Sequence, residues 1–292
     1  MPRRKGEEVC WFVLISNIKI WAKKIIYKLV FQLSKTRVGM EVERLVIESA
    51  MMRTTSVRHA GVNINFCIPN ALTRWRADTF SEKEPETLNW IDEQKPGSVF
   101  WDVGANVGLY SIYAVKSRRA KVYAFEPSIF NLEVLGRNIV KNQCAEDIFI
   151  IPLAINNQNS FALMRHTTTE WGGALSSFDA KFGHDGKNLK SIFSYNTVGL
   201  YSDFMVSQKL VPPPQYLKID VDGLEHIILS NSKKMLSSVQ SILIEVNENF
   251  SEQKTMVEKI LKEAGFSNIV REKSPFAGEG AHGDVFNQIW QK

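Results

Sequence analysis

The stretch Asp102-Val103-Gly104-Ala105-Asn106-Val107-Gly108 decides the fold of this chain. It follows an apolar run at residues 98–101 and leads into a helix-compatible run at 109–113, so it predicts a strand, a glycine turn and a helix. Gly104 and Gly108 permit backbone angles that other residues avoid, and they let a ligand approach without meeting a Cβ atom. Asp102 comes where the strand ends and Asn106 lies within the turn, so both side chains are expected at the crevice over the carboxyl edge of a parallel sheet. This arrangement predicts a site for a nucleotide-like ligand.

The residues that this turn lacks narrow the choice of ligand. A dinucleotide site needs three glycines spaced G-x-G-x-x-G, with the pyrophosphate at a helix amino end. This turn has two glycines and no basic residue between positions 102 and 115, and no Gly-Lys-Ser/Thr follows that would make a P-loop. An acidic residue at the head of the turn instead suits a ligand with an ammonium and a sulfonium group, as in S-adenosyl-L-methionine. A purely structural glycine turn is the alternative at this point.

A second strand and helix follow the first. Residues 121–125 form a short buried-strand pattern that ends at Glu126-Pro127, and apolar residues at helical spacing follow Ser128. Glu126 comes 24 positions after Asp102, close to the offset of about 20 residues at which a carboxylate meets ribose hydroxyls in such folds. Glu126 is therefore expected to hold a ribose. A solvated Glu before a turn proline is the alternative.

A third strand pattern, at residues 216–220, ends in a group of acidic residues. Residues two apart on a strand point to the same side, so Asp220 and Asp222 are expected to share a face. Two such carboxylates are tolerated where they bind a cation, share a proton or face water. A fourth strand, at residues 241–246, carries Glu245 in an apolar run, and this residue lies either near the same crevice or at the exposed end of its strand.

Taken together, these segments resemble the FkbM family of S-adenosylmethionine-dependent methyltransferases. The resemblance rests on the segments at 102–108, 125–127, 153–155, 217–225 and 244–245, and their order and spacing match across about residues 75 to 290. It implies a class I methyltransferase fold: α/β and Rossmann-like, with a seven-stranded, mostly parallel sheet and helices on both faces. In this chain an N-terminal helical extension precedes that domain.

The resemblance also implies an activity, namely O-methylation of a hydroxyl on a sugar, a glycan or a related small molecule. The residues expected to bind the cofactor are Asp102, Gly104, Asn106, Gly108, Glu126, Ala154 and Asp220. Asp220 would lie nearest the transferred methyl and take the hydroxyl proton, with Asp222 or Glu225 in support. The family usually has Glu where this chain has Asp222, which leaves the role of that residue open. No metal site is assigned, although a divalent cation between Asp220 and Asp222 stays open.

Two other classes of function stay open from the sequence. A nicotinamide-dependent oxidoreductase would have to bind pyrophosphate with an incomplete glycine set. A non-catalytic cofactor-binding partner would bind the cofactor without methyl transfer.

The domain organisation expected is an N-terminal basic amphipathic extension at residues 1–60 and a methyltransferase domain at 61–292, in which 161–198 is an inserted segment on the acceptor side. The first 37 residues hold nine Lys or Arg against two Glu, a net of +7, whereas the whole chain carries +5. Apolar residues from Trp11 to Leu33 recur at helical spacing, away from the lysines. This helix is expected either to contact an anionic membrane surface peripherally or to dock on its own domain or on a second copy in a homo-oligomer.

Other features of the sequence exclude some classes of function. Ser16, Asn17 and Lys19 interrupt the apolar run, so no spanning helix is expected. The apolar core at residues 9–15 is minimal and no A-x-A-like cleavage site follows it, so no signal peptide is expected either. Three well-separated cysteines favour a reducing, cytoplasmic compartment, and the aromatic residues do not alternate with the lysines as nucleic-acid binding would require. Four further residues are weighed as ligand contacts or bases against ordinary packing and surface roles: Trp75, Arg76, His166 and His184.

Overall fold

The computed structural model describes residues 21, 24–273 and 284–292. The chain divides into two compact units, with the division between Arg53 and Thr54. In the smaller unit, residues 24–33 are helical, and helix α2 (Arg37–Met51) begins where the Thr36 side chain accepts a hydrogen bond from the Gly39 N–H. The first part of the expected amphipathic stripe, Trp11 to Ile18, lies outside the described residues. Within the described ranges, no helix has the length and apolar character needed to cross a membrane.

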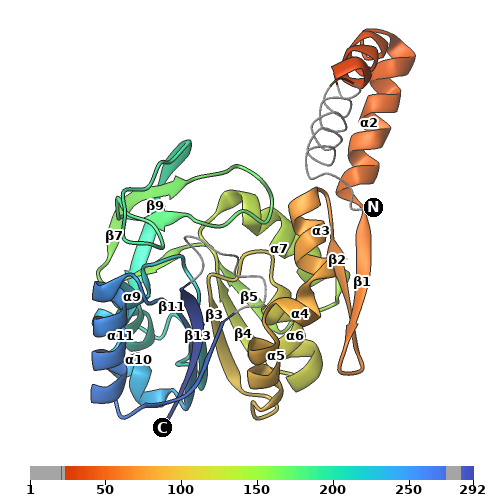
Figure 1. Cartoon of the computed structure of the whole chain (residues 1–292). Coiled ribbons are helices and arrows are strands. Elements are labelled where there is room, and N and C mark those ends of the chain that lie inside the picture. Colours follow the sequence, from red (N-terminus) through yellow and green to blue (C-terminus); the bar gives the residue numbers. More distant parts are fainter. Residues whose placement is uncertain (1–20, 22–23, 274–283) are drawn as a thin grey trace, which may run out of the picture. The chain divides into compact units, whose positions relative to one another are not determined.

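The larger unit, in its described residues, is built on a seven-stranded sheet (Figure 1). Its strands, in spatial order, are β12 (Ser267–Glu272), β13 (Val285–Gln291), β11 (Ser241–Asn247), β10 (Tyr216–Ile219), β3 (Val99–Val103), β4 (Lys121–Phe125) and β5 (Ile148–Ile151). Strands β11, β10, β3, β4 and β5 pair in parallel, whereas β13 runs antiparallel to both of its neighbours. The expected seven-stranded, mostly parallel sheet is confirmed.

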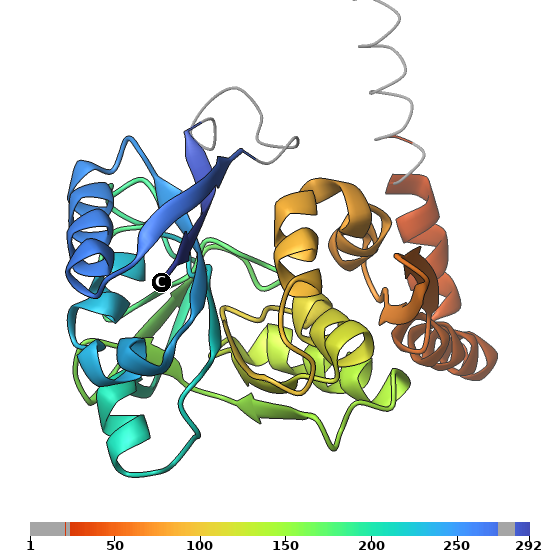
Figure 2. The ribbon, with the colours of Figure 1, turned by 90° about the horizontal axis from the view of Figure 1, so that it is seen from below.

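Helices cover both faces of this sheet, because successive side chains of each strand alternate between two apolar cores (Figures 1 and 2). Phe100 and Val122 pack in the core that includes α5 (Pro85–Asp92), α6 (Leu109–Arg118) and α7 (Ile129–Lys141). Trp101 and Phe125 pack in the other, which includes residues of α8 (Ser202–Ser207), α9 (Glu225–Ser230), α10 (Lys233–Ser238) and α11 (Ser251–Glu263).

Two additions to the main sheet frame its carboxyl edge. The first is the hairpin β1 (Thr54–His59) and β2 (Val62–Cys67), followed by α3 (Ala71–Asp78) and α4 (Phe80–Lys83). Asn70 starts α3 with a capping box shared with Thr73. The second is a four-stranded sheet in the order β6 (Ala154–Asn156), β9 (Phe193–Tyr201), β7 (Ser160–His166), β8 (Ser177–Phe178), visible beside the main sheet in Figure 1. The segment 161–198, expected as an insertion, forms β8 and most of β7 and β9.

Candidate functional site

A cavity of about 370 Å³ opens at the carboxyl edge of the sheet. Its walls come from the glycine turn after β3, the segment after β10, the end of β11, helices α3 and α4, and residues 174–175 beyond β7. Among the lining residues are Arg76, Lys83, Glu84, Gly104, Asn106, Tyr110, Leu175, His184, Lys218, Asp220, Asp222, Glu245 and Asn287. Several chain segments that are distant in sequence therefore meet at one site.

The two turn glycines are required first of all by contacts within the protein. Gly104 has a φ of +85°, and a Cβ built there would lie 1.9 Å from the Asp220 carbonyl oxygen. Gly108 has a φ of +82°, and its Cβ would lie 2.4 Å from Leu135 Cδ1. Gly104 also lines the cavity, whereas Gly108 lies behind it. The glycine pattern thus fixes how the turn packs against β10 and α7, in addition to leaving room for a ligand.

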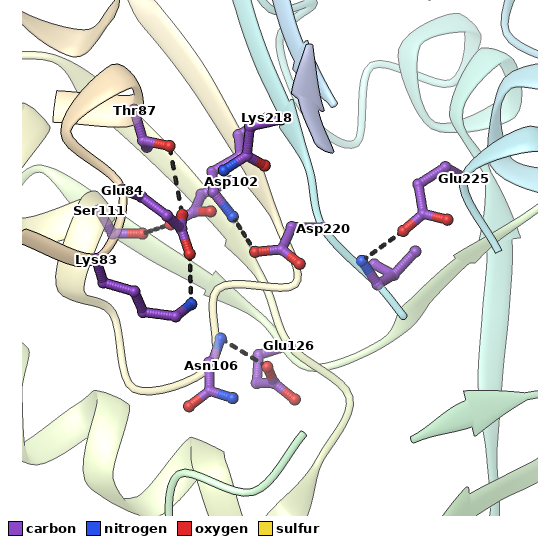
Figure 3. Close-up of polar contacts among 12 residues, drawn as sticks. Lys83, Glu84, Thr87, Asp102, Asn106, Ser111, Glu126, Lys218, Asp220 and Glu225 are labelled. Atoms are coloured by element: carbon purple, nitrogen blue, oxygen red, sulfur yellow. Dashed lines mark hydrogen bonds and ion pairs between the residues drawn. The ribbon is translucent and has the colours of Figure 1, made fainter. Parts of the chain in front are cut away.

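Asn106 and Glu126 hold the glycine turn together. The backbone N–H of Asn106, whose φ is +52°, donates to Glu126 Oε2 at 2.7 Å, and Ser128 N–H donates to Glu126 Oε1 at 2.8 Å. Burial, partly offset by these N–H groups, raises the pKa of Glu126 to about 7. The Asn106 side chain lines the cavity and donates from Nδ2 to Gly173 O at 2.8 Å. Glu126 lies beside Asn106 (Figure 3) and is not among the residues that line the cavity.

Asp102 and Ala154 also lie outside the cavity wall. Asp102 is 1% exposed and accepts a hydrogen bond from Ser111 Oγ of α6 at 2.6 Å, and burial raises its pKa. Its Oδ1 is buried and has no hydrogen-bond partner within the described ranges. Ala154 packs in a small apolar core with Met164 and Phe178 of the second sheet.

Lys218 and Asp220 form an ion pair at the base of the cavity (Figure 3). Lys218 Nζ lies 2.7 Å from Asp220 Oδ2 and 5.2 Å from the centre of the Tyr110 ring. The Lys218 side chain is 1% exposed, against 28% for Asp220. Burial favours the neutral amine, but the charges of Asp220, Asp102 and Glu84 outweigh it and raise the pKa of Lys218. A lysine inside an otherwise apolar strand was a sequence signal for this pair that our interpretation did not use.

Glu84 and Lys83 extend this network from the other wall. The Glu84 carboxylate pairs with Lys83 Nζ and accepts from Thr87 Oγ1 at 3.3 Å. Burial disfavours the charged form of Glu84, but Lys83 and Lys218 outweigh that effect and lower its pKa to about 2. Sequence reasoning did not place these residues at the site, because the charge of Glu84 meets that of Lys218 on β10, more than a hundred residues away.

Asp222 and Glu225 both bind backbone N–H groups. Asp222 lines the cavity with a φ of +60°, and its Oδ2 accepts from Leu175 N–H at 2.6 Å. Burial and the charge of Asp220 raise its pKa to about 6. Glu225 is fully buried, accepts from Val221 N–H at 3.0 Å and from Gly223 N–H at 3.3 Å, and does not line the cavity. Burial raises the pKa of Glu225 to about 7.

Glu245 lies at the cavity, which decides between the two placements that the sequence left open. It is on β11, paired with Asn287 of β13. Burial and then the charges of Asp220 and Asp222 raise its pKa well above the ordinary value.

The two histidines differ in position. His166 is 2% exposed, stacks on Tyr195 with ring centres 5.5 Å apart, and does not line the cavity, whereas His184 does. Trp75 and Arg76 line the cavity as well, and Arg76 Nε donates to Gly172 O at 2.7 Å. In the described part of the chain, no group of three or more His, Cys, Asp or Glu side chains is placed to hold a metal ion.

Comparison with known families identifies this arrangement. The model of the Methyltransferase FkbM domain matches residues 102–267, which is more than half of the 292 residues. The chain belongs to the FkbM methyltransferase family. The matched range begins at Asp102, passes through the glycine turn, Glu126, Asp220 and Glu245, and ends after α11. The FkbM resemblance stated from the motifs, and the class I methyltransferase fold that it implied, are confirmed.

A curated relative of this FkbM methyltransferase is hexuronic acid methyltransferase AglP of Haloferax volcanii. It is 25% identical over 209 residues, which are 71% of this chain and 80% of that protein. Among solved structures, fibrillarin of Aeropyrum pernix with natively bound S-adenosyl-L-methionine has a TM-score of 0.45 and 11% identity, covering 83% of this chain and 84% of its own. TYW2 of M. jannaschii in complex with AdoMet has a TM-score of 0.42 and 13% identity, covering 82% and 86%.

Proposed function

We propose that this FkbM methyltransferase transfers the methyl group of S-adenosyl-L-methionine to a hydroxyl oxygen of a sugar or glycan. The observation that carries the proposal is the set of carboxylates Asp220, Asp222 and Glu245, which face one cavity beside a glycine turn without basic residues. Carboxylates complement a ligand that has ammonium and sulfonium charges. Lys83 and Lys218, which line the same cavity, are already paired with carboxylates, so they leave little positive charge for a diphosphate.

The residues of the glycine turn fit the methionine part of this cofactor. Asn106 Oδ1 is buried and has no hydrogen-bond partner in the described residues, so an ammonium group could satisfy it. Gly104 presents backbone without a side chain to the cavity. Asp102, through Ser111, and Gly108, against Leu135, would support the turn from behind.

The remaining cofactor residues are assigned by their order along the sheet edge. Glu126 follows β4 and would hold the ribose hydroxyls with the lone pairs that its two N–H partners leave free. Ala154 would lie near the adenine side. Asp220 follows β10 and would lie nearest the transferred methyl, held in place by Lys218.

The chemistry requires an aligned displacement more than covalent help from the protein. When bound, S-adenosylmethionine supplies a methyl group activated by its sulfonium. The protein orients the two reactants, and alignment of this kind can account for about 7 to 11 kcal/mol of a barrier. Carboxylates at the cavity supply a group that can accept the hydroxyl proton. Glu225 would act by fixing the 221–223 turn, since its Oε1 accepts from the N–H groups of Val221 and Gly223.

The acceptor class is inferred from the curated relative. Because AglP is described as a hexuronic acid methyltransferase, we propose a sugar or glycan as the acceptor here. The cavity has an aromatic and a cationic residue in its α3 wall, Trp75 and Arg76, which suits a sugar ring that carries a carboxylate.

The first test is ligand binding. S-adenosylhomocysteine is expected to raise the melting temperature of the purified protein, whereas NAD is not. Glu126→Ala should weaken S-adenosylhomocysteine binding roughly 10- to 100-fold, because hydrogen bonds to a charged acceptor contribute about 1.5 to 3 kcal/mol. Glu146→Ala, at an exposed glutamate elsewhere, serves as the matched control. Stabilisation by NAD alone would favour the oxidoreductase alternative.

The second test is methyl transfer. Incubation with S-adenosylmethionine and a panel of p-nitrophenyl glycosides of glucuronic acid, galacturonic acid and glucose is expected to yield a product heavier by one methyl unit, detected by mass spectrometry. Cofactor binding without transfer to any glycoside or glycan extract would instead support a non-catalytic binding partner.

A further inference from the structure

A transfer to oxygen releases one proton, and the cavity must contain a group that receives it. This inference rests on the proposed function. In the described residues four carboxylates line the cavity: Glu84, Asp220, Asp222 and Glu245.

Three of these four carboxylates are already engaged. Glu84 is paired with Lys83, and Asp220 Oδ2 lies 2.7 Å from Lys218 Nζ. Asp222 Oδ2 accepts from Leu175 N–H at 2.6 Å. A carboxylate held in this way accepts a proton only at the expense of its existing contact. The side-chain carboxylate of Glu245, by contrast, makes no hydrogen bond or ion pair with any part of the chain that the structure describes.

The sheet topology places Glu245 on the side of the cavity away from the proposed ribose site. The strand order is β4, β3, β10, β11, β13, so Glu126 and Glu245 lie on opposite sides of the glycine turn. Ile219 of β10 pairs with Ile244 of β11, so Asp220 and Glu245 each come one residue beyond that pair. Neighbouring strands are about 5 Å apart. Glu245 is thus the next carboxylate after Asp220 along the sheet edge, on the side away from Glu126.

We propose that Glu245 is the catalytic base that accepts the acceptor's hydroxyl proton. The hydroxyl oxygen forms the new bond to the methyl carbon, and the electron pair of the broken carbon–sulfur bond stays on sulfur. The proton passes from the hydroxyl to a Glu245 carboxylate oxygen and then to solvent through the open cavity.

The surrounding charges fit this role. Burial, followed by the charges of Asp220, Asp222, Glu225 and Glu84, raises the pKa of Glu245. Lys83, Lys218, Arg76 and His184 line the same cavity. A cationic sulfonium in the cavity favours the ionised form of Glu245, and the neutral thioether product favours the protonated form. The proton affinity of Glu245 therefore increases as methyl transfer proceeds, which suits a proton acceptor.

One experiment needs no acceptor. Proton release on ligand binding is measured at about pH 7 by calorimetry in buffers of different ionisation enthalpy. S-adenosylmethionine should release more protons than S-adenosylhomocysteine, which lacks the sulfonium charge, and Glu245→Gln should reduce this difference by the share that Glu245 contributes. Glu248→Gln replaces a glutamate three residues on that does not line the cavity, and it should behave as the wild type. Equal release by the two ligands in the wild type, or a difference that is as large in Glu245→Gln as in the wild type, would overturn the proposal.

The kinetic experiment uses the acceptor found in the glycoside panel. Glu245→Gln should lower kcat by about 100-fold or more, within the range of general base catalysis, and leave S-adenosylhomocysteine affinity within about threefold. It should also flatten the rise of kcat with pH, and Glu245→Asp should restore part of the rate. Full turnover in Glu245→Gln would refute the base assignment alone. A wild type that binds neither ligand would refute the proposed function instead.

Discussion

Replacing Gly104 with alanine is expected to disrupt the junction between the glycine turn and β10. At a φ of +85°, an L-residue pays about 1–2 kcal/mol. The new Cβ would lie 1.9 Å from the Asp220 carbonyl oxygen, a backbone atom that cannot rotate away. The strand end or the turn would have to shift, and overpacking of this kind costs about 1–3 kcal/mol. The expected loss in the free energy of unfolding is therefore about 2–5 kcal/mol.

Gly136→Ala provides a matched control with the opposite sign. Gly136 lies within α7, and a Cβ built there meets nothing within 4 Å. Because alanine is favoured over glycine in a helix interior, this variant should gain about 0.5–1 kcal/mol.

Thermal unfolding checks both variants. For a unit of this size about 1 kcal/mol corresponds to about 2–4 °C, so Gly104→Ala should melt about 4–20 °C lower and Gly136→Ala slightly higher. Gly104→Ala should also lose S-adenosylhomocysteine affinity, because the Asp220 carbonyl borders the cavity. A Gly104→Ala protein that melts within about a degree of the wild type would refute the packing argument.

Three further predictions concern the charged groups of the site. Lys218→Met leaves Asp220 and Glu84 without their buried cation and should lower the free energy of unfolding by about 3–5 kcal/mol at neutral pH, with a smaller loss in acid, where the carboxylates can be protonated. Urea titrations at both pH values measure this loss. A loss that is independent of pH would contradict the electrostatic explanation. Because the folded-state pKa of Glu126 is raised to about 7 from an ordinary value of 4.5, the folded protein keeps a proton that the unfolded chain releases. Stability should therefore fall by up to about 3 kcal/mol as pH rises through this window, and Glu126→Gln should make that fall shallower in urea unfolding. Asp222→Asn keeps an acceptor oxygen and tolerates the positive φ of +60°, so its free energy of unfolding should stay close to that of the wild type. Asp222→Ala should lower the free energy of unfolding by about 2–4 kcal/mol, which the same urea titrations measure. Equal stabilities of the two variants would show that the bonds to Leu175 and Ser176 contribute little.

Much of the fold could be predicted because its signals are local. The strand, turn and helix around Gly104 and Gly108 follow from the order of apolar residues and glycines within about 16 positions. The strand patterns before Glu126 and Asp220 have the same local character. Parallel strands separated by helices then lead to a sheet whose carboxyl ends share one edge, which is how residues 102, 126 and 220 come together.

The arrangement of side chains in the site was harder to predict from the sequence, because it depends on contacts between residues that are far apart in the chain. Asp220 and Asp222 were expected to share a face through strand alternation. Both line the cavity, but β10 ends at Ile219 and Asp222 reaches the wall through a left-handed backbone conformation. No sequence pattern near Asp222 predicts that its carboxylate accepts a hydrogen bond from the N–H of Leu175, 47 residues earlier. The same holds for the contact of Glu84 with Tyr110 of α6 and for its charge interaction with Lys218 of β10.

The raised pKa values around this cavity have a common cause and a common consequence. Asp222, Glu126 and Glu225 have pKa values of about 6, 7 and 7, and that of Glu245 is also raised well above its ordinary value, because burial disfavours each charged form and several neighbours are also acidic. Part of the site is therefore protonated near neutral pH, and a cationic ligand must displace those protons. Affinity for S-adenosylmethionine should consequently rise with pH between about 6 and 8, whereas affinity for the product, which lacks the sulfonium charge, should change less. The same burial that selects for a cation thus also favours release of the neutral product.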